Sequence, residues 1–505
     1  MEGSGSTTSI WMASSAWPRH GSAAPGERAE VAVIGAGIAG LTTAYLLQAD
    51  GRDVQVLTAG PIGAGETSRS TTHLSNVIDD RFSEIEQFHG TDGIRLAAES
   101  HGAAIDRIEA IAEAEGIDCD FRRVDGYLVL ADGSPESLLD DELAAARRAG
   151  LEAAERVDRP PAPGFGDRPA LRFPRQGRVH ALHYLLGLAR AFEQRGGRIA
   201  SNARVTHVDR GKPAVVHLAD GGRLSAGFVA CCTNAPIVDH FAIHTKQAPY
   251  RTYVLGCRVP KGAVPDALYW DTLDPYHYVR LQEAADHDVL IVGGEDHKTG
   301  HAPDMERRYR DLEDWTRRHF PECGQVPYRW SGQVLEPFDG LAFIGRDPGN
   351  DPNILIATGD SGMGITHGTI AGLLLADLIG GRDNPWAHIY DPSRKQIATA
   401  GTWIRENLDV ARQMSDHLQP SEVASAEAIE PGGGAVMRDG LVRVAVHRDH
   451  QGTLHRFSAV CPHLKCVVHW NPGEKTWDCP CHGSRFSALG EVLCGPAHDN
   501  LAPHD

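Results

Sequence analysis

The sequence has no long apolar run and no excess of positive charge. No segment approaches the roughly 18 apolar residues of a transmembrane helix, so we expect no integral membrane span. The 505 residues carry 49 Lys and Arg against 67 Asp and Glu, a formal net charge of −18. This acidic balance disfavours a nucleic-acid-binding surface. Residues 1–28 contain no continuous apolar stretch. We therefore interpret them as an N-terminal arm rather than a signal peptide, and expect a cytoplasmic location.

Cysteine is scarce over most of the chain. Only 10 cysteines occur in 505 residues, and the last of them gather between positions 461 and 494. A secreted disulfide scaffold would be short and rich in cysteine throughout, so that class is excluded. Residues 419–434 are rich in Pro, Gly, Glu, Ser and Ala, as interdomain linkers are. We therefore expect a helix and linker over 396–434, followed by a separate C-terminal domain over 435–505.

A glycine loop near the N-terminus indicates a dinucleotide site. The apolar run 31–34 predicts a buried strand, and it is followed by Gly35-x-Gly37-x-x-Gly40 and a helical pattern. Gly35 makes the tight turn, Gly37 lets the backbone approach a pyrophosphate, and Gly40 allows close helix–strand packing. The helix N-terminus supplies amide donors for the phosphates. The alternative is a purely structural glycine turn.

The acidic residue that usually follows such a loop is missing. It is expected about 20 residues further on, where it binds the ribose hydroxyls. Here the second strand, 54–57, leads to Thr58. A threonine hydroxyl can bind a ribose, but it brings no charge.

Two further segments resemble a known family. The run from Leu57 to Ser75 and the segment from Ile354 to Gly381, with its turn Gly359 to Gly364, resemble D-amino-acid-oxidase-like, or glycine-oxidase-like, FAD-dependent oxidoreductases. The resemblance covers roughly residues 30–395. It implies an FAD site whose glycine-rich turn and helix N-terminus face the flavin pyrimidine. The residues that it implies at the cofactor are Gly35, Gly37, Gly40, Thr58, Ser68, Thr72, His73, Val205, Gly359, Asp360, Gly362, Met363 and Gly364.

His73 carries a sharper hypothesis. The run Ser70-Thr-Thr-His73 resembles the segment in which amine dehydrogenases related to dimethylglycine dehydrogenase link a histidine covalently to the flavin. A neutral imidazole nitrogen is nucleophilic near pH 7. The alternative is a histidine that only hydrogen-bonds near the cofactor.

The family fold implies an α/β region followed by an all-β domain. The α/β region, 29–395, would divide into a Rossmann-type FAD part and an inserted substrate part with an antiparallel sheet, which suits the alternating runs at 250–300. The FAD part would comprise 29–90, 180–235 and 336–395, and the substrate part 91–179 and 236–335. Within the latter we expect Arg280 to clamp a substrate carboxylate, with Tyr278, His277 and Lys298 nearby. The alternative for each is a solvent-facing or ion-paired sheet residue.

The C-terminal cysteines stand in two boxes, Cys461-Pro-His463 and Cys479-Pro-Cys481-His482. Two thiolates and two imidazoles are the ligand set of a Rieske [2Fe–2S] centre. The boxes resemble that pattern, which implies Cys461 and Cys479 on one iron and His463 and His482 on the other. The resemblance to the cytochrome-bc type also implies a Cys466–Cys481 disulfide. A tetrahedral zinc site is the alternative, although the added cysteine pair is not zinc-finger spacing.

The combination predicts an oxidoreductase that relays electrons. A flavin accepts two electrons from an organic donor, whereas a Rieske centre carries one at a time. We expect an amine or amino-acid substrate, with a partner protein or O2 as the final acceptor. The alternative is a reductase component that moves electrons through FAD and the cluster to or from a partner. If NAD(P)H fed it, a second nucleotide-binding loop would be needed, and none is evident. A Rieske oxygenase is also disfavoured, because its mononuclear-iron domain would follow position 505.

Overall fold

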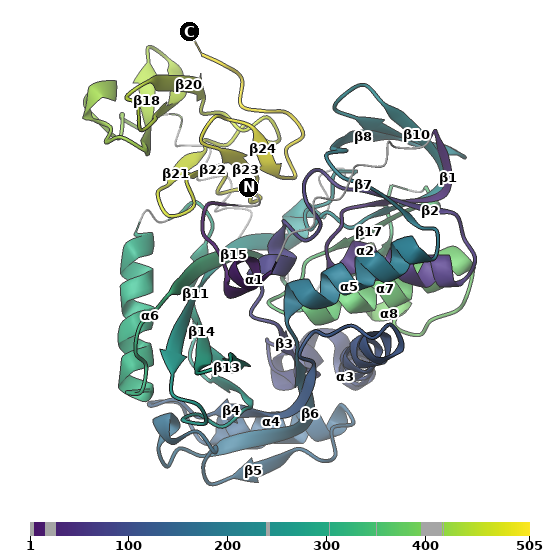
Figure 1. Cartoon of the computed structure of the whole chain (residues 1–505), viewed down its shortest axis with the longest axis vertical. Coiled ribbons are helices and arrows are strands. Elements are labelled where there is room, and N and C mark those ends of the chain that lie inside the picture. The colour runs from purple at the N-terminus through teal and green to yellow at the C-terminus, as the bar shows by residue number, and fades with distance from the viewer. Residues whose placement is uncertain are drawn as a thin grey trace.

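The computed structural model describes most of the chain. The helix expected within 396–434 lies almost wholly outside the described residues. The described part forms two large sheets with helices and two small antiparallel sheets, which confirms the predicted α/β plus all-β fold class (Figure 1). No helix among these residues is long and apolar enough to cross a membrane. The described residues are 5–15, 27–238, 243–301, 304–349, 351–394, 417 and 419–504.

The first large sheet is built from three separated parts of the chain. Its central strands pair in parallel and are buried, which explains why they occur as continuous apolar runs. An antiparallel extension, β8 (Val205–Asp209) and β9 (Ala214–Leu218), continues from β10. The main strand order is β16 (Phe343–Arg346), β17 (Ile354–Thr358), β10 (Arg223–Cys231), β1 (Arg28–Ile34), β2 (Val54–Leu57) and β7 (Arg198–Ala200).

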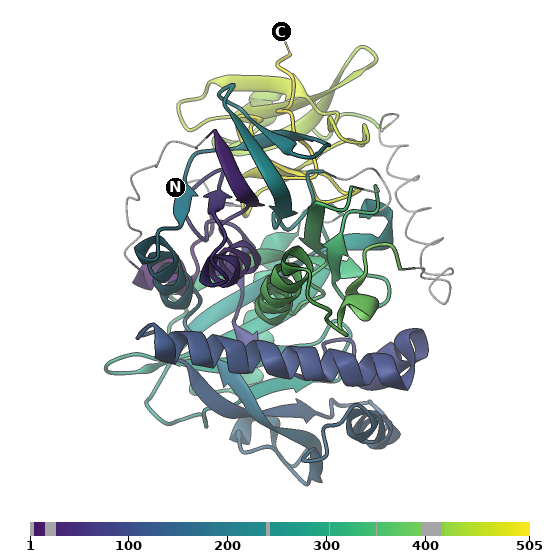
Figure 2. The same ribbon diagram turned by 90° about the vertical axis from the view of Figure 1, so that its right-hand side faces the viewer.

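Three helices pack side by side on this sheet: α2 (Ile38–Ala49), α5 (Ala181–Gln194) and α7 (Gly364–Gly380). Helices α2 and α7 approach closely because α7 presents glycines. A Cβ at Gly372 would lie 2.3 Å from Thr42 Cγ2. Figure 2 shows the long helix α3 (Phe82–Ala114) crossing beneath these three helices and separating them from the lower part of the molecule.

The second large sheet is mostly antiparallel, as the alternating runs at 250–300 predict. Helix α6 (Met305–His319) packs on β11 (Gln247–Val259) and β14 (Asp288–Lys298). Helix α4 (Ser137–Arg148) lies at the opposite end near β5 (Glu155–Val157) and β6 (Ala170–Arg178). A short helix, α8 (Ala387–Tyr390), packs near α3 and β16. The strand order is β15 (Tyr328–Pro337), β11 (Gln247–Val259), β14 (Asp288–Lys298), β13 (Tyr278–Glu283), β12 (Leu268–Asp271), β4 (Arg122–Val129), β6 (Ala170–Arg178) and β3 (His73–Leu74).

The C-terminal domain consists of two small sheets at one end of the molecule, one of which lies next to the large sheets (Figure 1). It has its own core, in which Trp477 and Phe486 are fully buried beside the cysteines of the two boxes. One sheet contains β18 (Gly433–Asp439), β19 (Val442–Arg448) and β20 (Leu454–Ser458). The other contains β21 (His469–Asn471), β22 (Thr476–Asp478), β23 (Arg485–Ser487) and β24 (Val492–Cys494).

The described start of the N-terminal arm is packed into the molecule. Helix α1 (Ile10–Ser14) buries Trp11 completely, and the Trp11 indole N–H donates to the Ser70 carbonyl at 2.7 Å. Just before it, the Thr7 hydroxyl donates to Glu474 Oε1 of the C-terminal domain at 2.6 Å. The arm therefore joins the first sheet's loops to the C-terminal domain.

Candidate active site and metal centre

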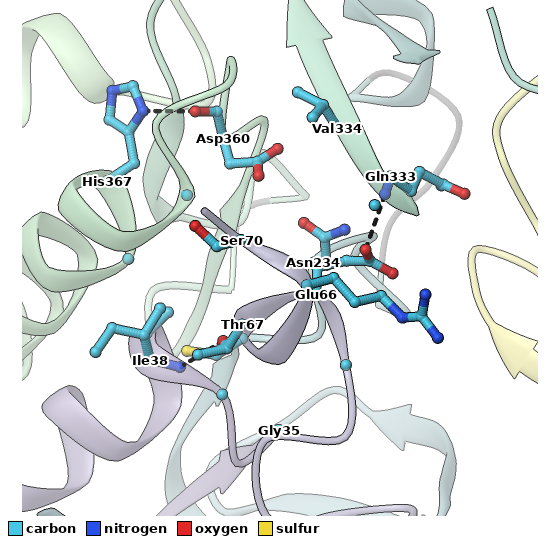
Figure 3. Close-up of a pocket in the computed structure, with 18 of the residues that line it drawn as sticks. Gly35, Ile38, Glu66, Thr67, Ser70, Asn234, Gln333, Val334, Asp360 and His367 are labelled. Atoms are coloured by element: carbon cyan, nitrogen blue, oxygen red, sulfur yellow. Dashed lines mark hydrogen bonds between the residues drawn. The ribbon is translucent and has the colours of Figure 1, made fainter. Parts of the chain in front are cut away.

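A cavity of about 410 Å³ lies where the two large sheets and the C-terminal domain meet. Its walls come from the glycine loop, the segment after β2, the turn before α7 and the strands of the second sheet. Figure 3 shows Gly35, Thr67, Ser70, Asn234 and Asp360 arranged around it. Its lining draws on segments distant in sequence that the fold brings together.

The glycine loop has the geometry that a pyrophosphate requires. Gly35 has φ +107°, and a Cβ there would lie 2.3 Å from the Cys232 carbonyl oxygen. A Cβ at Gly40 would lie 1.9 Å from the Gly35 carbonyl oxygen, so this glycine allows the helix to pack rather than lining the cavity. Gly37 lines the cavity at the N-terminus of α2, and the Ile38 N–H donates to Thr67 Oγ1 at 3.1 Å (Figure 3). These residues fit the phosphates of a dinucleotide.

Thr58 and Val205 line the same end of the cavity, on the side expected for the adenosine. The sequence did not indicate their neighbours. Arg204 and Asn234 also line this end, as does the C-terminal domain's segment 492–498, apart from Pro496. Nothing in a local motif marks segment 492–498, because only the folded domain brings it to the first sheet.

The turn before α7 forms the opposite end. Asp360, Gly362, Met363 and Gly364 line the cavity, whereas Gly359 makes the turn behind them with φ +73°. His367 Nδ1 bonds the Asp360 carbonyl oxygen at 2.8 Å and thereby holds the turn against α7 (Figure 3). Burial raises the pKa of the Asp360 carboxyl to about 7.

The segment after β2 alternates between cavity and core. Ser70, Thr71 and His73 line the cavity. Ser68 and Thr72 do not line it, because their hydroxyls donate to the Gly65 carbonyl at 3.1 Å and the Val179 carbonyl at 2.7 Å. The prediction that these two contact the cofactor therefore has no support in the geometry.

His73 is neutral and held at both ring nitrogens. Nε2 lies 3.2 Å from the Val279 carbonyl oxygen and so carries the proton. Nδ1 then accepts from the Thr71 hydroxyl at 3.0 Å. Burial, with a further contribution from Arg280, lowers the pKa of His73 to about 3.

The structure does not place Arg280, the predicted substrate clamp, at the cavity. Arg280 is fully buried and does not line the cavity. Its guanidinium donates to the Val179 carbonyl at 3.1 Å and to Gln282 Oε1 at 2.8 Å, and it lies 5.3 Å from the Trp11 ring. These contacts and the Trp11 ring of the arm enclose the guanidinium, which is therefore turned away from the cavity.

Only one of the other three residues predicted beside the substrate reaches the cavity. His277 bonds Asp271 at 3.0 Å and stacks on Trp315, and neither it nor Lys298 lines the cavity. Tyr278 does line it, with its hydroxyl 2.6 Å from Thr252 Oγ1 and its ring 5.5 Å from that of His73.

The two C-terminal boxes converge on one site. Cys461, Cys479 and His482 are buried, and the ring centroids of His463 and His482 lie 5.2 Å apart. His482 Nδ1 is buried without a hydrogen-bond partner in the described chain, as expected of a metal-ligating nitrogen. Burial lowers the pKa of His463 to about 4 and that of His482 to about 3, so both imidazoles are neutral. The four side chains fit a Rieske cluster.

The predicted disulfide between Cys466 and Cys481 is confirmed. Both of its sulfur atoms lie within 4.8 Å of the Cys479 sulfur. The disulfide therefore joins the two ligand-bearing loops directly beside the cluster site. It also removes two thiolates that could otherwise compete as metal ligands.

A buried network of ion pairs joins the C-terminal domain to Arg69, in the cavity-lining segment that follows β2. The Glu474 carboxylate is fully buried, 3.2 Å from Arg69 and 3.8 Å from Arg251. Asp478 lies 3.2 Å from Arg485. Although burial opposes ionisation, Arg69, Arg251 and Arg485 lower the pKa of Glu474 to about 2. Burial costs several kcal/mol per ion, and the surrounding charges and hydrogen bonds offset it.

Two family models match the chain, one over its larger N-terminal part and one over its C-terminal part. Residues 30–378 match the model described as FAD dependent oxidoreductase. Residues 419–505 match the Rieske [2Fe-2S] domain.

Among similar proteins, the Rieske 2Fe-2S iron-sulfur protein YhfW of Bacillus subtilis is 32% identical over 489 residues, covering 96% of this chain and 95% of that protein. The gamma-glutamylputrescine oxidoreductase of Escherichia coli is 29% identical over 371 residues, covering 70% of this chain and 84% of that protein. The structure of glycine oxidase from Geobacillus kaustophilus superposes with a TM-score of 0.61 at 18% identity, covering 73% of this chain and 100% of that one.

Proposed function

The chain belongs to the FAD-dependent oxidoreductase family and carries a Rieske [2Fe–2S] domain, and on that premise we propose that it oxidises the C–N bond of an amine or amino acid and relays the electrons from flavin to cluster. When bound, the flavin accepts an electron pair, and the cluster carries single electrons onward. The final acceptor would be a partner protein or O2.

The contact made by Gln333 carries the relay proposal. Gln333 lines the flavin cavity, and its side-chain amide donates to the Gly483 carbonyl at 3.0 Å. Gly483 directly follows His482, one of the proposed cluster ligands. One buried side chain thus connects the cavity wall to the ligand loop, which supports electron transfer within a single chain.

A histidine of the oxidoreductase part supports the same proposal. The His244 ring lies 5.2 Å from that of His463 and 6.0 Å from that of His482, measured between centroids. All three imidazoles have pKa values lowered by burial. The histidine side of the cluster therefore faces the body of the protein.

The relay is tested by mixing the purified protein with amines and amino acids under anaerobic conditions. Flavin bleaching is followed by its absorbance and cluster reduction by the Rieske EPR signal. We expect bleaching first and the EPR signal second. In His482→Ala, which lacks one ligand, bleaching should persist without the signal. A flavin that bleaches completely while the wild-type cluster stays oxidised would contradict the relay. Rapid bleaching by NADH or NADPH would favour the alternative function as a reductase component.

A further inference from the structure

We propose that the substrate is a cationic amine without a carboxylate, recognised by carboxylates and aromatic rings that line the cavity where it meets the second sheet. The inference rests on the proposed C–N oxidation and narrows its substrate class. It follows from what lines the cavity where it meets the second sheet, and from where the basic side chains near the cavity are directed.

Carboxylates are the charged groups at this end of the cavity. Asp79, Asp296, Glu336 and Asp360 all line it. Three of them accept hydrogen bonds from neutral donors. Asp79 accepts from the Tyr276 hydroxyl at 2.7 Å, Glu336 from the Ser361 hydroxyl at 3.1 Å, and Asp360 from the Leu335 N–H at 3.0 Å. Asp296 Oδ1 is buried and has no hydrogen-bond partner among the described residues. Among the described residues, no Lys or Arg forms a salt bridge with any of the four; Arg308, whose charge acts on Asp296, pairs with Asp304 at 3.7 Å.

Aromatic rings share this region with the carboxylates. Trp270, Tyr276 and Tyr278 line the cavity, and the two tyrosine rings lie 5.4 Å apart. An ammonium group is attracted to aromatic faces, most strongly when it has been desolvated. Rings beside unpaired carboxylates therefore suit a cation better than an anion.

The basic residues near the cavity are committed elsewhere. Among its described lining residues, Arg69 and Arg204 are the only Lys or Arg side chains. Arg69 bonds Glu474 and the carbonyls of Ser331 and Gly5. Arg204 precedes Val205, at the end expected to hold adenosine. Arg280 is turned into the core. A substrate carboxylate would thus meet four carboxyl groups, whose ionisation it would oppose, without a cationic partner.

The titration behaviour of the carboxylates agrees with an absent cation. Burial and the neighbouring Asp80 raise the pKa of Asp79 to about 8, and burial raises that of Asp296 to about 7. A bound ammonium would favour their ionised forms. In the reaction the ammonium would release one proton to a carboxylate of the cavity wall, and the adjacent carbon would give a hydride, with its two electrons, to a bound flavin. A C=N bond forms as the C–H bond breaks.

Matched substrate pairs that differ by one carboxylate test the proposal. Butylamine is compared with norvaline, and 1,4-diaminobutane with ornithine, by the rate of anaerobic flavin bleaching. We expect each amine to reduce the flavin at least tenfold faster than its amino acid at equal concentration. Equal or faster bleaching by the amino acids would overturn the proposal.

Ligand binding gives a readout that needs no turnover. Tetramethylammonium should perturb the flavin absorbance at concentrations at which acetate does not. Asp296→Asn should raise the concentration of tetramethylammonium needed for that perturbation at least tenfold. Asp314→Asn, at an exposed position on α6, is the matched control. If Asp296→Asn fails to fold, Asp79→Asn replaces it. Perturbation by acetate alone, or by neither ion, would count against the proposal.

Failure of the relay would look different from failure of this inference. If amines bleach the flavin but the cluster stays oxidised, the relay is wrong and the substrate class stands. If amino acids are preferred and the cluster becomes reduced, the relay stands and the substrate class is wrong.

Discussion

At the scale of single residues, His73 shows how neighbours restrict chemistry. Both ring nitrogens are engaged, by Thr71 and by Val279. A covalent bond to flavin would break one of these hydrogen bonds. We therefore predict non-covalent FAD: after acid precipitation the yellow colour should be recovered in the supernatant. Colour retained in the pellet after washing would contradict this. His73→Ala should still lower FAD occupancy, because the ring lines the cavity.

Glu474 gives a residue-scale prediction about pH. Its pKa is lowered to about 2 in the folded protein, below the ordinary value of about 4.3. A depressed carboxyl pKa stabilises the fold above the ordinary value, and that contribution is lost as the pH falls towards 2. Glu474→Gln leaves the buried Arg69 without a carboxylate partner and should cost about 3–5 kcal/mol near pH 7, with a smaller difference at pH 3. Melting curves at both pH values measure this, with Glu430→Gln, at an exposed position, as control. An equal effect at both pH values would contradict it.

The residues that could be predicted from sequence are those whose geometry is local. Cys461 and His463 are two positions apart, so their spacing alone brings both to one site. Arg280 shows the limit. It shares a strand face with Tyr278, but two residues advance the strand by about 7 Å. At that distance Trp11 of the N-terminal arm covers it, and no local pattern connects positions 11 and 280.

At the scale of elements, the two ligand loops depend on their disulfide. Cys466 and Cys481 are 15 residues apart, and closing a loop of that size contributes about 3 kcal/mol. We predict that replacing both with alanine lowers cluster retention while FAD binding persists. Iron and sulfide analysis beside flavin absorbance measures the two separately. Replacing Cys257 and Cys323 with alanine, which removes two free cysteines that do not line the cavity, is the control. Full cluster content in the double variant would contradict the prediction.

Helices and strands with a clear pattern of apolar residues could be predicted from the sequence. The contacts between them were harder to predict. Strands β1 and β2 and helix α2 follow from apolar runs and a glycine loop within 30 residues. The close packing of α2 on α7 depends on Gly372 meeting Thr42, which are 330 positions apart. The sequence indicates each helix, but tertiary packing decides which glycine faces which partner.

At the scale of the whole molecule, the C-terminal domain is a wall of the flavin cavity as well as a separate fold. The linker and cysteine boxes predict a domain with its own cofactor. They contain no information about docking, because the contacts join positions such as Thr7 and Glu474, 467 residues apart. The buried charges at this contact fix the domain's position on the body.

The docked position gives a last prediction, on Gln333. The hydrogen bond from its side-chain amide to the Gly483 carbonyl contributes about 1 kcal/mol. That free energy changes the ratio of docked to undocked ligand loop by a factor of about five. Gln333→Leu keeps the main-chain N–H that donates to Glu66 but removes the amide. We expect cluster reduction to slow about fivefold relative to flavin bleaching, in stopped-flow absorbance checked by rapid-freeze EPR. Gln325→Leu, at an exposed position, should leave that ratio unchanged. If Gln333→Leu also leaves it unchanged while the cluster EPR signal is intact, electrons do not depend on this contact. The route from cavity to cluster would then have to run elsewhere, for example past His244.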